Sequence, residues 1–400
     1  MKARYRYRLY PTAQQQRALA KVFGCTRIVW NDSLALVRSV PEGQKWPSNA
    51  ELQKLCITQA KRTVERAWLS EVSNIPLQQS VADLGVAFKN WFASLKGKGR
   101  AKFPRFKSRH GKQSARFRNG GFSLKGNKLF LAKLGLFKVK WSRPLPAEPS
   151  SVTVLKNKVG QYHVSFVVEV QRRSVESVRE SIGLDLGIKT FCFPSVGEPI
   201  QAPDYSRLDR RIRRLQKRLA RQHKGSNRRA LTKQKIAKLH LKVRNIRKDF
   251  LHKLSTRLVR ENQSISLEDL NVAGLVRNRR LARAISQQGW REFRTLLESK
   301  TAQYADRQVQ VINRWEPTSQ VCSGCGFRWG KLDLSVRSVK CVSCGTIHDR
   351  DQNAAKNIER SGRRMSEDKG ASRAHKTTSV AMPAEVLSQP YQEKQLCLSL

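Results

Sequence analysis

The spacing of apolar residues changes once in the first quarter of the chain, from alternation to helical periodicity. Basic and apolar or aromatic side chains alternate over residues 4–10, which is typical of a β-strand with one buried face. Over 11–95 apolar residues recur at helical spacing, and capping-box patterns at Thr12 and Ser48 mark helix starts. We therefore predict a β-strand at 4–10 followed by a helical unit over 11–95.

Residues 122–170 return to alternation and predict strands. The segments 152–155 and 162–170 flank a turn near 157–160, which is the pattern of a β-hairpin. We expect these strands to form one barrel-like sheet together with the strand at 4–10.

A basic stretch precedes these strands. Residues 96–118 contain ten Lys and Arg and no acid, interleaved with Phe103, Phe106 and Phe117. The simpler interpretation is a solvated charged loop. The aromatic residues favour nucleic-acid contact instead, because they need either burial or a base on which to stack.

The second half of the chain alternates short apolar runs with helical segments. Buried strands are predicted at 182–187, with a hairpin partner at 190–194, and at 265–268. Between them, residues 204–250 hold 18 Lys and Arg against three Asp, with apolar residues spaced along one face. This pattern predicts an antiparallel helical hairpin with an apolar seam and a basic outer surface. Such a surface could serve solubility alone, but its single sign of charge favours phosphate contact.

The net charge narrows the class of protein. The chain has 79 Lys and Arg against 30 Asp and Glu, a formal net charge of +49, while 39% hydrophobic residues still supply real cores. This excess argues against an ordinary small-molecule enzyme and makes nucleic acid the expected partner. The first residues form no apolar signal region and no run of about 18 apolar residues follows, so we expect no membrane association and a cytosolic location.

Four of the eight cysteines form two C-x-x-C pairs, separated by 15 residues. Two such knuckles can build a closed tetrahedral thiolate site that suits one structural Zn²⁺ ion. His348 follows closely and is an alternative ligand, and four reduced cysteines without metal are the simpler interpretation. The predicted zinc ligands are Cys322, Cys325, Cys341 and Cys344.

Three carboxylates stand out by their context. Asp185 lies within an apolar strand, Glu268 ends another, and Asp351 opens a predicted helix after the cysteines. Acids in apolar strands indicate either buried ion pairs or a divalent metal site. Converging carboxylates can bind a pair of Mg²⁺ ions, which would activate water and stabilise the leaving oxygen of a phosphodiester. A basic surface with a local acidic cluster is what a nuclease requires.

Several segments of the chain resemble those of a known family. The segments GLDLGIKT (183–190), LEDL (267–270), TSQVCSGCG (318–326) and DRDQNAA (349–355) resemble those of the TnpB family, the OrfB proteins of insertion sequences, which are related to type V CRISPR effectors. Further matches are FPRFK (103–107), DFLHK (249–253) and NRRLA (278–282) followed by Gly289 and Trp290. The resemblance extends over about residues 4–360.

The resemblance implies an α/β multidomain fold. An RNase H-like (RuvC) nuclease domain with an inserted zinc ribbon would follow a β-barrel wedge domain that carries a helical recognition insertion. Mapped onto this chain, the expected domains are the wedge barrel at 1–10 and 96–176, the recognition unit at 11–95, the nuclease at 177–316 and 346–360 with its basic hairpin at 204–260, the ribbon at 317–345, and a disordered tail at 361–400.

The resemblance also implies an activity, RNA-guided cleavage of DNA. The expected partners are a guide RNA from the transposon end and double-stranded target DNA, with the oligomeric state left open. Asp185, Glu268 and Asp351 match the family's catalytic Mg²⁺ ligands. Asp349 lies in the same motif as Asp351 and is the less favoured ligand, with a role in assisting Asp351 left open. The alternatives are an RNA-guided DNA-binding regulator that does not cut, and a transposase that also joins strands.

Overall fold

The chain folds into two compact units. The computed structural model describes residues 1–172, 174–333 and 335–377, with the backbone alone from 368 onward. One unit comprises Met1–Arg173 and Asp204–Asn245, and the other comprises Ser174–Pro203 and the chain from Ile246. We call these the first and the second unit. Each contains its own sheet, and no described helix is long and apolar enough to cross a bilayer.

The first unit contains a seven-stranded antiparallel sheet in the order β2-β6-β7-β1-β5-β4-β3. Strand β1 lies at its centre and pairs with both β5 and β7, as the sequence predicted. The strands are β1 (Lys2–Tyr10), β2 (Gln113–Arg118), β3 (Phe122–Lys125), β4 (Lys128–Leu131), β5 (Gly135–Lys140), β6 (Pro149–Lys156) and β7 (Tyr162–Glu169).

This sheet must curl on itself. Its two edge strands, β2 and β3, are joined by residues 119–121 alone. A flat seven-stranded sheet would separate its edges by about 29 Å, whereas a three-residue link spans at most about 14 Å. The sheet is therefore barrel-like, and Phe117, Phe137 and Phe166 are fully buried in its core.

Helices cover the barrel within the same unit. Both predicted capping boxes form: Thr12 accepts a hydrogen bond from the Gln15 backbone at 3.3 Å, and Ser48 accepts one from the Glu51 backbone at 3.2 Å. The prediction of a helical region over 11–95 is thus confirmed. Its elements are α1 (Ala13–Arg38), α2 (Asn49–Gln53), the π-helix η1 (Lys54–Gln59), the 3-10 turns η2 (Ala60–Arg62) and η3 (Ala67–Glu71), and α3 (Asn74–Leu95).

The aromatic residues of the basic stretch are largely used for packing. Phe117 is buried in the barrel, and Phe103 packs edge-on against Phe88 and Trp91, with ring centroids 5.6 and 4.9 Å apart. Phe106 is exposed, with the Arg38 guanidinium 4.7 Å from its ring centroid. Base stacking therefore remains open to Phe106 but not to Phe103 or Phe117.

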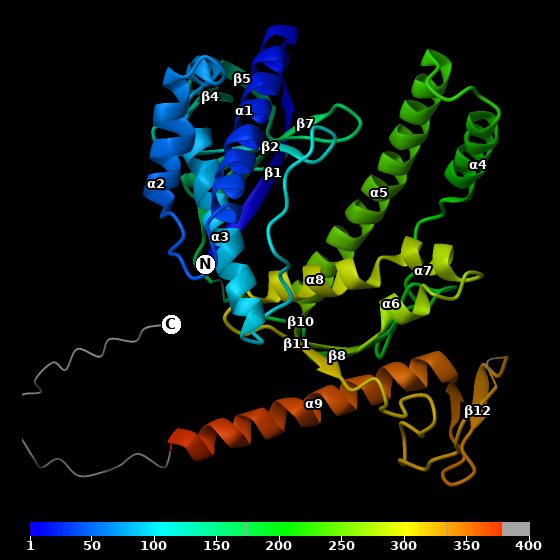
Figure 1. The fold of residues 1–400 in the computed structure, drawn as a ribbon. Helices are drawn as coiled ribbons and strands as arrows, with labels where there is room; N and C mark the ends of the chain where they lie inside the picture. Colours follow the sequence, from blue (N-terminus) through cyan, green and yellow to red (C-terminus); the bar gives the residue numbers. More distant parts are fainter. Residues whose placement is uncertain (173, 334, 378–400) are drawn as a thin grey trace, which may run out of the picture. The chain divides into compact units, whose positions relative to one another are not determined.

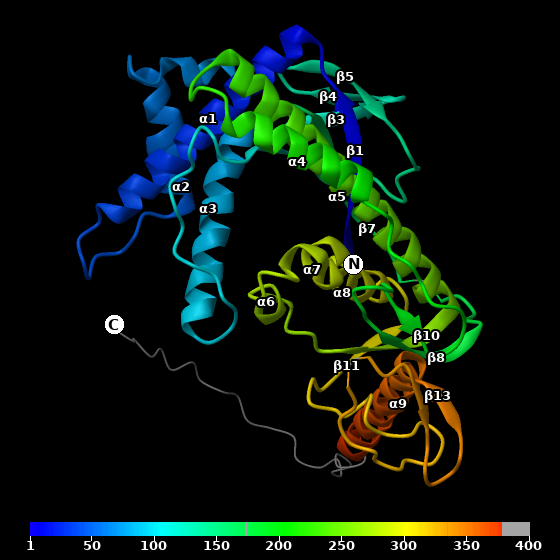
Figure 2. The ribbon, with the colours of Figure 1, turned by 90° about the vertical axis from the view of Figure 1, so that its right-hand side faces the viewer.

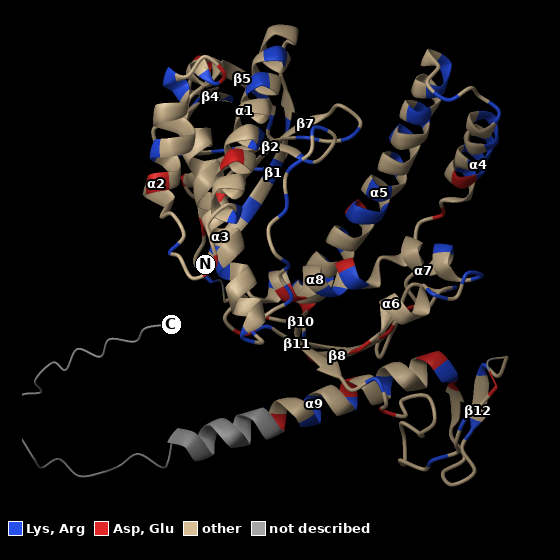
Figure 3. Ribbon diagram, in the orientation of Figure 1, with Lys and Arg blue, Asp and Glu red and all other residues tan. Residues whose placement is uncertain are grey.

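The predicted basic hairpin is present as α4 (Ser206–Ala220) and α5 (Asn227–Glu261), which lie side by side and antiparallel (Figure 1, Figure 2). At the turn, Arg229 donates hydrogen bonds to the carbonyl oxygens of Leu219 and Gln222 at 2.5 and 2.8 Å. Lys and Arg lie along both helices (Figure 3). Residues 204–245 group with the first unit and the rest of α5 groups with the second. The assignment of the hairpin to the nuclease domain stays a prediction.

The second unit is built on a four-stranded sheet in the order β11-β10-β8-β9. Strands β8, β10 and β11 are parallel, and β9 pairs antiparallel with β8 as the predicted hairpin partner. The strands are β8 (Arg179–Asp185), β9 (Phe193–Pro194), β10 (Asn262–Glu268) and β11 (Gln308–Ile312).

Helices cover both faces of this sheet, α8 on one and α9 on the other (Figure 1, Figure 2). The core between the sheet and α8 includes Leu184, Leu267, Phe293 and Leu297. The remaining elements of this unit are α6 (Val272–Leu275), α7 (Ala282–Gln288), α8 (Trp290–Thr301), the hairpin strands β12 (Ser338–Lys340) and β13 (Ile347–Asp349), and α9 (Arg350–Thr377).

Helix α9 approaches the sheet very closely and is longer than predicted. A Cβ at Gly183 in β8 would lie 2.1 Å from the Ala355 carbonyl oxygen, and one at Gly362 in α9 would lie 1.9 Å from Ser266 Oγ in β10. Because Gly362 is packed on the sheet, the expectation of a disordered tail from 361 is wrong for 361–377, which are helical. Residues 378–400, also assigned to that tail, lie outside the described residues.

Candidate metal centres

Two of the three predicted carboxylates lie side by side at one edge of the sheet. Strands β8 and β10 are parallel and Leu184 pairs with Leu267, so Asp185 and Glu268, the next residues, both end their strands at this edge. Asp351 is the second residue of α9 and lies in its first turn. The close packing of α9 on β8 at Gly183 brings this turn to the same end of the sheet.

The three acids are near enough to perturb one another. Burial, followed by the charges of Glu268 and Asp351, raises the pKa of Asp185 to about 7, while Arg350 and the Leu186 backbone act in the opposite direction. Burial also raises the pKa of Glu268, which a hydrogen bond from Thr318 partly offsets. Asp185 therefore shares its surroundings with two other acids, at a cost that an added cation would relieve.

Each of the other two acids has a polar partner. The Thr318 hydroxyl donates a hydrogen bond to Glu268 Oε1 at 2.6 Å, and Arg337 pairs with Asp351 at 3.0 Å. Sequence reasoning gave neither Thr318 nor Arg337 a role, although Thr318 lies within the TSQVC segment. Among the described residues, ion pairing accounts for Asp351 but not for Asp185 or Glu268.

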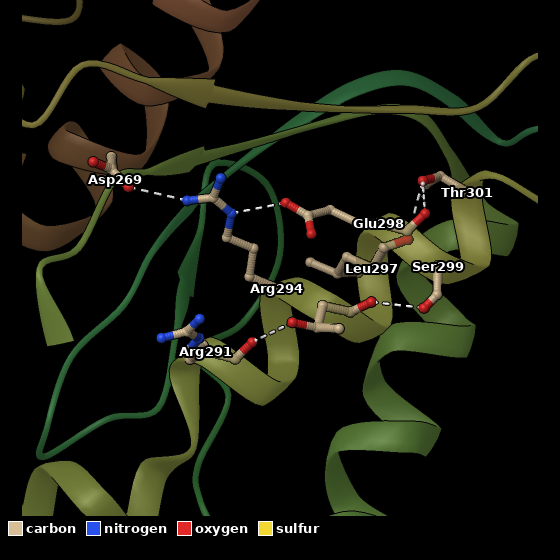
Figure 4. A network of polar contacts seen from close by, with 8 residues as sticks. Asp269, Arg291, Arg294, Leu297, Glu298, Ser299 and Thr301 are labelled. Carbon is tan, nitrogen blue, oxygen red and sulfur yellow. Dashed lines mark hydrogen bonds and ion pairs between the residues drawn. The ribbon is translucent and has the colours of Figure 1, made fainter. Parts of the chain in front are cut away.

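The acids next to Glu268 and Asp351 in the sequence, Asp269 and Asp349, make other contacts. Asp269 pairs with Arg294 at 3.0 Å and with Arg314, and Arg294 continues the network to Glu298 at 2.8 Å (Figure 4). The hydrogen bond from Arg314 is the largest cause of the lowered pKa of Asp269. Asp349 instead accepts a hydrogen bond from the Gln352 backbone at 2.9 Å at the start of α9.

The carboxylate set fits a hard divalent cation. Asp185, Glu268 and Asp351 offer oxygen ligands, which Mg²⁺ prefers. Burial is the largest cause of the raised pKa of Asp185, and the charges of the other two acids add to it; a bound cation would offset both effects. The oxygens of the three acids do not all lie within 4.8 Å of one another; among the described residues, the cysteines are the group of three or more metal-ligand side chains that meets this spacing. The assignment of these three acids as ligands stays a prediction.

A hollow of about 620 Å³ adjoins Glu268. Its walls are mainly apolar, and Glu268, Asp269 and Arg314 are the charged residues that line it. A larger hollow of about 1190 Å³ in the first unit has basic walls. Its basic lining residues are Arg27, Arg109, Lys112, Lys156, Lys158 and Arg244.

The four predicted zinc ligands come together. Their Sγ atoms all lie within 4.8 Å of one another, with Cys322 and Cys344 3.7 Å apart and Cys325 and Cys341 3.6 Å apart. A tetrahedral site with Zn–S bonds of about 2.3 Å requires sulfur separations of about 3.8 Å. The cluster therefore fits a zinc ion with little rearrangement.

The two knuckles share one backbone pattern. In the first, the Cys322 amide donates to the Phe327 carbonyl at 2.9 Å, and in the second the Cys341 amide donates to the Thr346 carbonyl at 2.9 Å. Each turn places a glycine after its second cysteine at positive φ, 83° for Gly326 and 73° for Gly345. A residue with a Cβ would be strained at this step of the turn.

His348 lies beside the cluster and is not a member of it. Its Nε2 is 3.0 Å from Cys322 Sγ, but the group that satisfies the metal-ligand spacing consists of the four cysteines. Burial, helped by the charge of Lys356, lowers the pKa of His348 and favours its neutral form. A neutral imidazole with its proton on Nε2 could donate to the sulfur.

The ribbon that carries the cysteines is fastened to α9. Asn353 donates to the Val321 carbonyl at 2.8 Å and accepts from the Ser323 amide at 2.8 Å. Asn357 donates to the carbonyl oxygens of Thr318 and Val321 at 2.8 and 2.7 Å. The first knuckle and the residues before it are thus held by the helix that carries Asp351.

Comparison with known proteins agrees with this arrangement. The OrfB family of IS605, described as "Probable transposase", matches residues 165–279, the Cas12f1-like TNB domain matches 290–358, and a helix-turn-helix domain matches 1–40. Within 1–40 the structure has strand β1 and the single helix α1. The second of these matches spans α8, the cysteine ribbon and the start of α9.

Whole-length relatives are more informative. A Streptomyces pristinaespiralis protein named "Putative RNA-guided DNA endonuclease" is 42% identical over 90% of both chains. An Escherichia coli K12 protein named "Putative RNA-guided DNA endonuclease InsQ" is 32% identical over 90% of this chain and 92% of that protein. A protein chain in a solved structure of a Cas12f1–sgRNA–target DNA complex is a distant match, 15% identical, with a TM-score of 0.49 over 86% of this chain and 81% of that chain. On the sequence relatives alone, the chain belongs to the TnpB (OrfB) family.

Proposed function

We propose that this protein is an RNA-guided DNA endonuclease of an insertion sequence that hydrolyses phosphodiester bonds with divalent ions bound by Asp185, Glu268 and Asp351. The names of the full-length relatives support the RNA-guided nuclease activity. The observation that carries the chemistry is the strand register, which ends the neighbouring strands β8 and β10 in Asp185 and Glu268, with Asp351 in the first turn of α9. Burial, followed by the charges of the other two acids, accordingly raises the pKa of Asp185. Such crowding is the state expected of carboxylates that await a cation.

In this proposal a RuvC-type centre binds two Mg²⁺ ions. The bound ions would activate a water molecule and stabilise the leaving oxygen of the phosphodiester. Asp185 and Glu268 are fixed by the register of β8 and β10, so their separation is set by the sheet. Thr318 orients Glu268, and Asp351 must exchange its pairing with Arg337 for metal coordination.

The basic surfaces would hold the nucleic acids. The hairpin at 204–250, with 18 Lys and Arg against three Asp, and the basic hollow of the first unit offer sites for phosphate contact. We propose that the guide RNA derives from the transposon end, that base pairing reads double-stranded target DNA in the cytosol, and that cutting serves transposon maintenance or transposition. Binding should weaken steeply with salt, because phosphate neutralisation releases counterions.

The test compares the parent protein with Asp185→Ala. The parent, loaded with the RNA that copurifies with it, should cut a matched DNA duplex in Mg²⁺, while Asp185→Ala should bind the RNA equally and leave the DNA intact. A parent that binds matched DNA without cutting it would indicate a regulator instead. Covalently joined donor and target strands would indicate a transposase.

A further inference from the structure

Thr318 donates a hydrogen bond to Glu268. Among the described residues, no other side chain donates to this carboxylate. The Thr318 hydroxyl lies 2.6 Å from Glu268 Oε1, and the Thr318 residue is 6% exposed. A donor at this distance from a half-buried carboxylate occupies one oxygen and fixes the plane of the group. The other oxygen, Oε2, is then free to face a cation.

Thr318 is itself held at both of its backbone groups. Its amide donates to the Glu316 carbonyl at 2.8 Å, and its carbonyl accepts from Asn357 at 2.8 Å. Asn357 is 7% exposed and belongs to α9, the helix that carries Asp351. The hydroxyl is therefore presented to Glu268 by a turn whose backbone is hydrogen-bonded through both its amide and its carbonyl.

The same backbone leads directly into the cysteine cluster. Val321, whose carbonyl accepts from both Asn353 and Asn357, immediately precedes Cys322, which is fully buried. Three residues thus separate the donor to Glu268 from the first cysteine, and hydrogen bonds from α9 hold Thr318 and Val321 at the two ends of this segment. Displacement of the knuckle would displace Thr318 as well.

We infer that Thr318 is a positioning residue for Glu268, and that the zinc ribbon supports the divalent-metal centre through it. This inference rests on the proposed function of the carboxylates as metal ligands. Loss of the hydroxyl leaves Glu268 free to rotate and leaves its buried oxygen without a donor. Removal of such an outer partner of a metal ligand weakens metal binding about 10- to 100-fold.

The experiment measures Mn²⁺ binding to the full-length protein by water proton relaxation, without nucleic acid. Thr318→Val removes the hydroxyl at nearly constant volume, and Thr318→Ser restores it. The matched control is Thr301→Val, because Thr301 is equally buried in the same unit but donates to the Leu297 carbonyl at 3.0 Å (Figure 4). Asp185→Ala identifies the fraction of Mn²⁺ bound at the carboxylates.

We expect Thr318→Val to raise the Mn²⁺ dissociation constant about 10-fold or more, with Thr318→Ser and Thr301→Val close to the parent. Zinc content should stay at one ion per chain in all of them, which separates lost positioning from an unfolded ribbon. Parent-like Mn²⁺ affinity in Thr318→Val would overturn the inference while leaving the proposed function intact. Mn²⁺ binding that Asp185→Ala does not change would instead contradict the proposed carboxylate site.

Discussion

The second unit contains two sets of predicted metal ligands, and the fold brings their members together in different ways. The four cysteines come from two turns between residues 322 and 344, and their sulfur atoms are already within 4.8 Å of one another. The three acids come from residues 185, 268 and 351, on two strands and a helix, and each is held by different surroundings. Thiols can gather while protonated, whereas carboxylates repel one another once ionised.

This difference distinguishes a site that stabilises the fold from a site proposed to carry out the reaction. A closed thiolate site has no free position for substrate, so its metal can only stabilise structure. The carboxylates keep polar partners, Thr318 on Glu268 and Arg337 on Asp351, which limit their mutual repulsion without an ion. The structural cluster is complete in itself, while the proposed catalytic cluster depends on packing between distant segments.

The largest effect should follow from breaking the cysteine cluster. Cys322→Ser should abolish zinc binding and unfold the ribbon, because a structural zinc site contributes on the order of 10 kcal/mol. Zinc content by elemental analysis should fall from one ion per chain to none. The control is Cys25→Ala, because Cys25 is buried but lies outside the cluster, and this variant should still bind one zinc ion per chain. Loss of zinc in the control as well would show that the zinc content follows overall stability rather than ligation by Cys322.

The second prediction compares each proposed ligand with its acidic neighbour. Glu268→Gln and Asp351→Asn should reduce DNA cleavage to background, because each removes a metal-ligand charge. Asp269→Asn and Asp349→Asn should retain most activity, since these acids pair with arginines and cap α9. Loss of a helix cap costs about 1 kcal/mol. Equal defects within either pair, measured as single-turnover cleavage rates, would contradict the assignment.

The third prediction concerns the contact that brings α9 to the carboxylates. Gly183→Ala would place a Cβ 2.1 Å from the Ala355 carbonyl oxygen, so the helix must move. We expect a loss of roughly 3 kcal/mol, at the upper end for overpacking, because backbone atoms cannot yield. Gly24→Ala in α1 meets nothing closer than 4.0 Å and should be neutral or stabilising in thermal unfolding.

The fourth prediction uses the pKa of Asp185. The folded state holds this proton up to about pH 7, while the unfolded carboxyl releases it near 3.8, so the folded state loses stability as pH rises between these values. Without added divalent ion, Asp185→Asn should be more stable than the parent at pH 8, with the difference shrinking towards pH 4. Denaturant titrations at both pH values measure this, and a difference that grows on acidification would refute it.

Much of the fold could be predicted because local patterns specify it. Alternation identified β1 and the β6–β7 hairpin, the capping boxes at Thr12 and Ser48 marked real helix starts, and the cysteine spacing predicted a cluster that forms. The four cysteines are close in sequence, so two turns suffice to bring them together. For the acids, their positions in and beside apolar strands singled out Asp185, Glu268 and Asp351, and the family resemblance assigned the three a common role that stays a prediction.

The features that sequence reasoning missed depend on tertiary contact. Phe117 resembles a stacking residue when read among its basic neighbours, but its strand pairs with β6 and buries it. The polar composition after 360 suggested disorder, yet α9 continues because Gly362 fits against Ser266. Thr318 could have been singled out only by knowing that its hydroxyl faces Glu268.

Helix α9 also limits how far the protein can be shortened. A deletion that begins before Gly362 would strip the cover from Ser266 and would remove Ser366, whose hydroxyl accepts hydrogen bonds from Gln308 and Gln310 of β11 at 3.2 and 3.0 Å. The outer strand of the sheet would then face water along one side. A minimal version of this protein therefore needs the polar stretch beyond the last recognisable family motif.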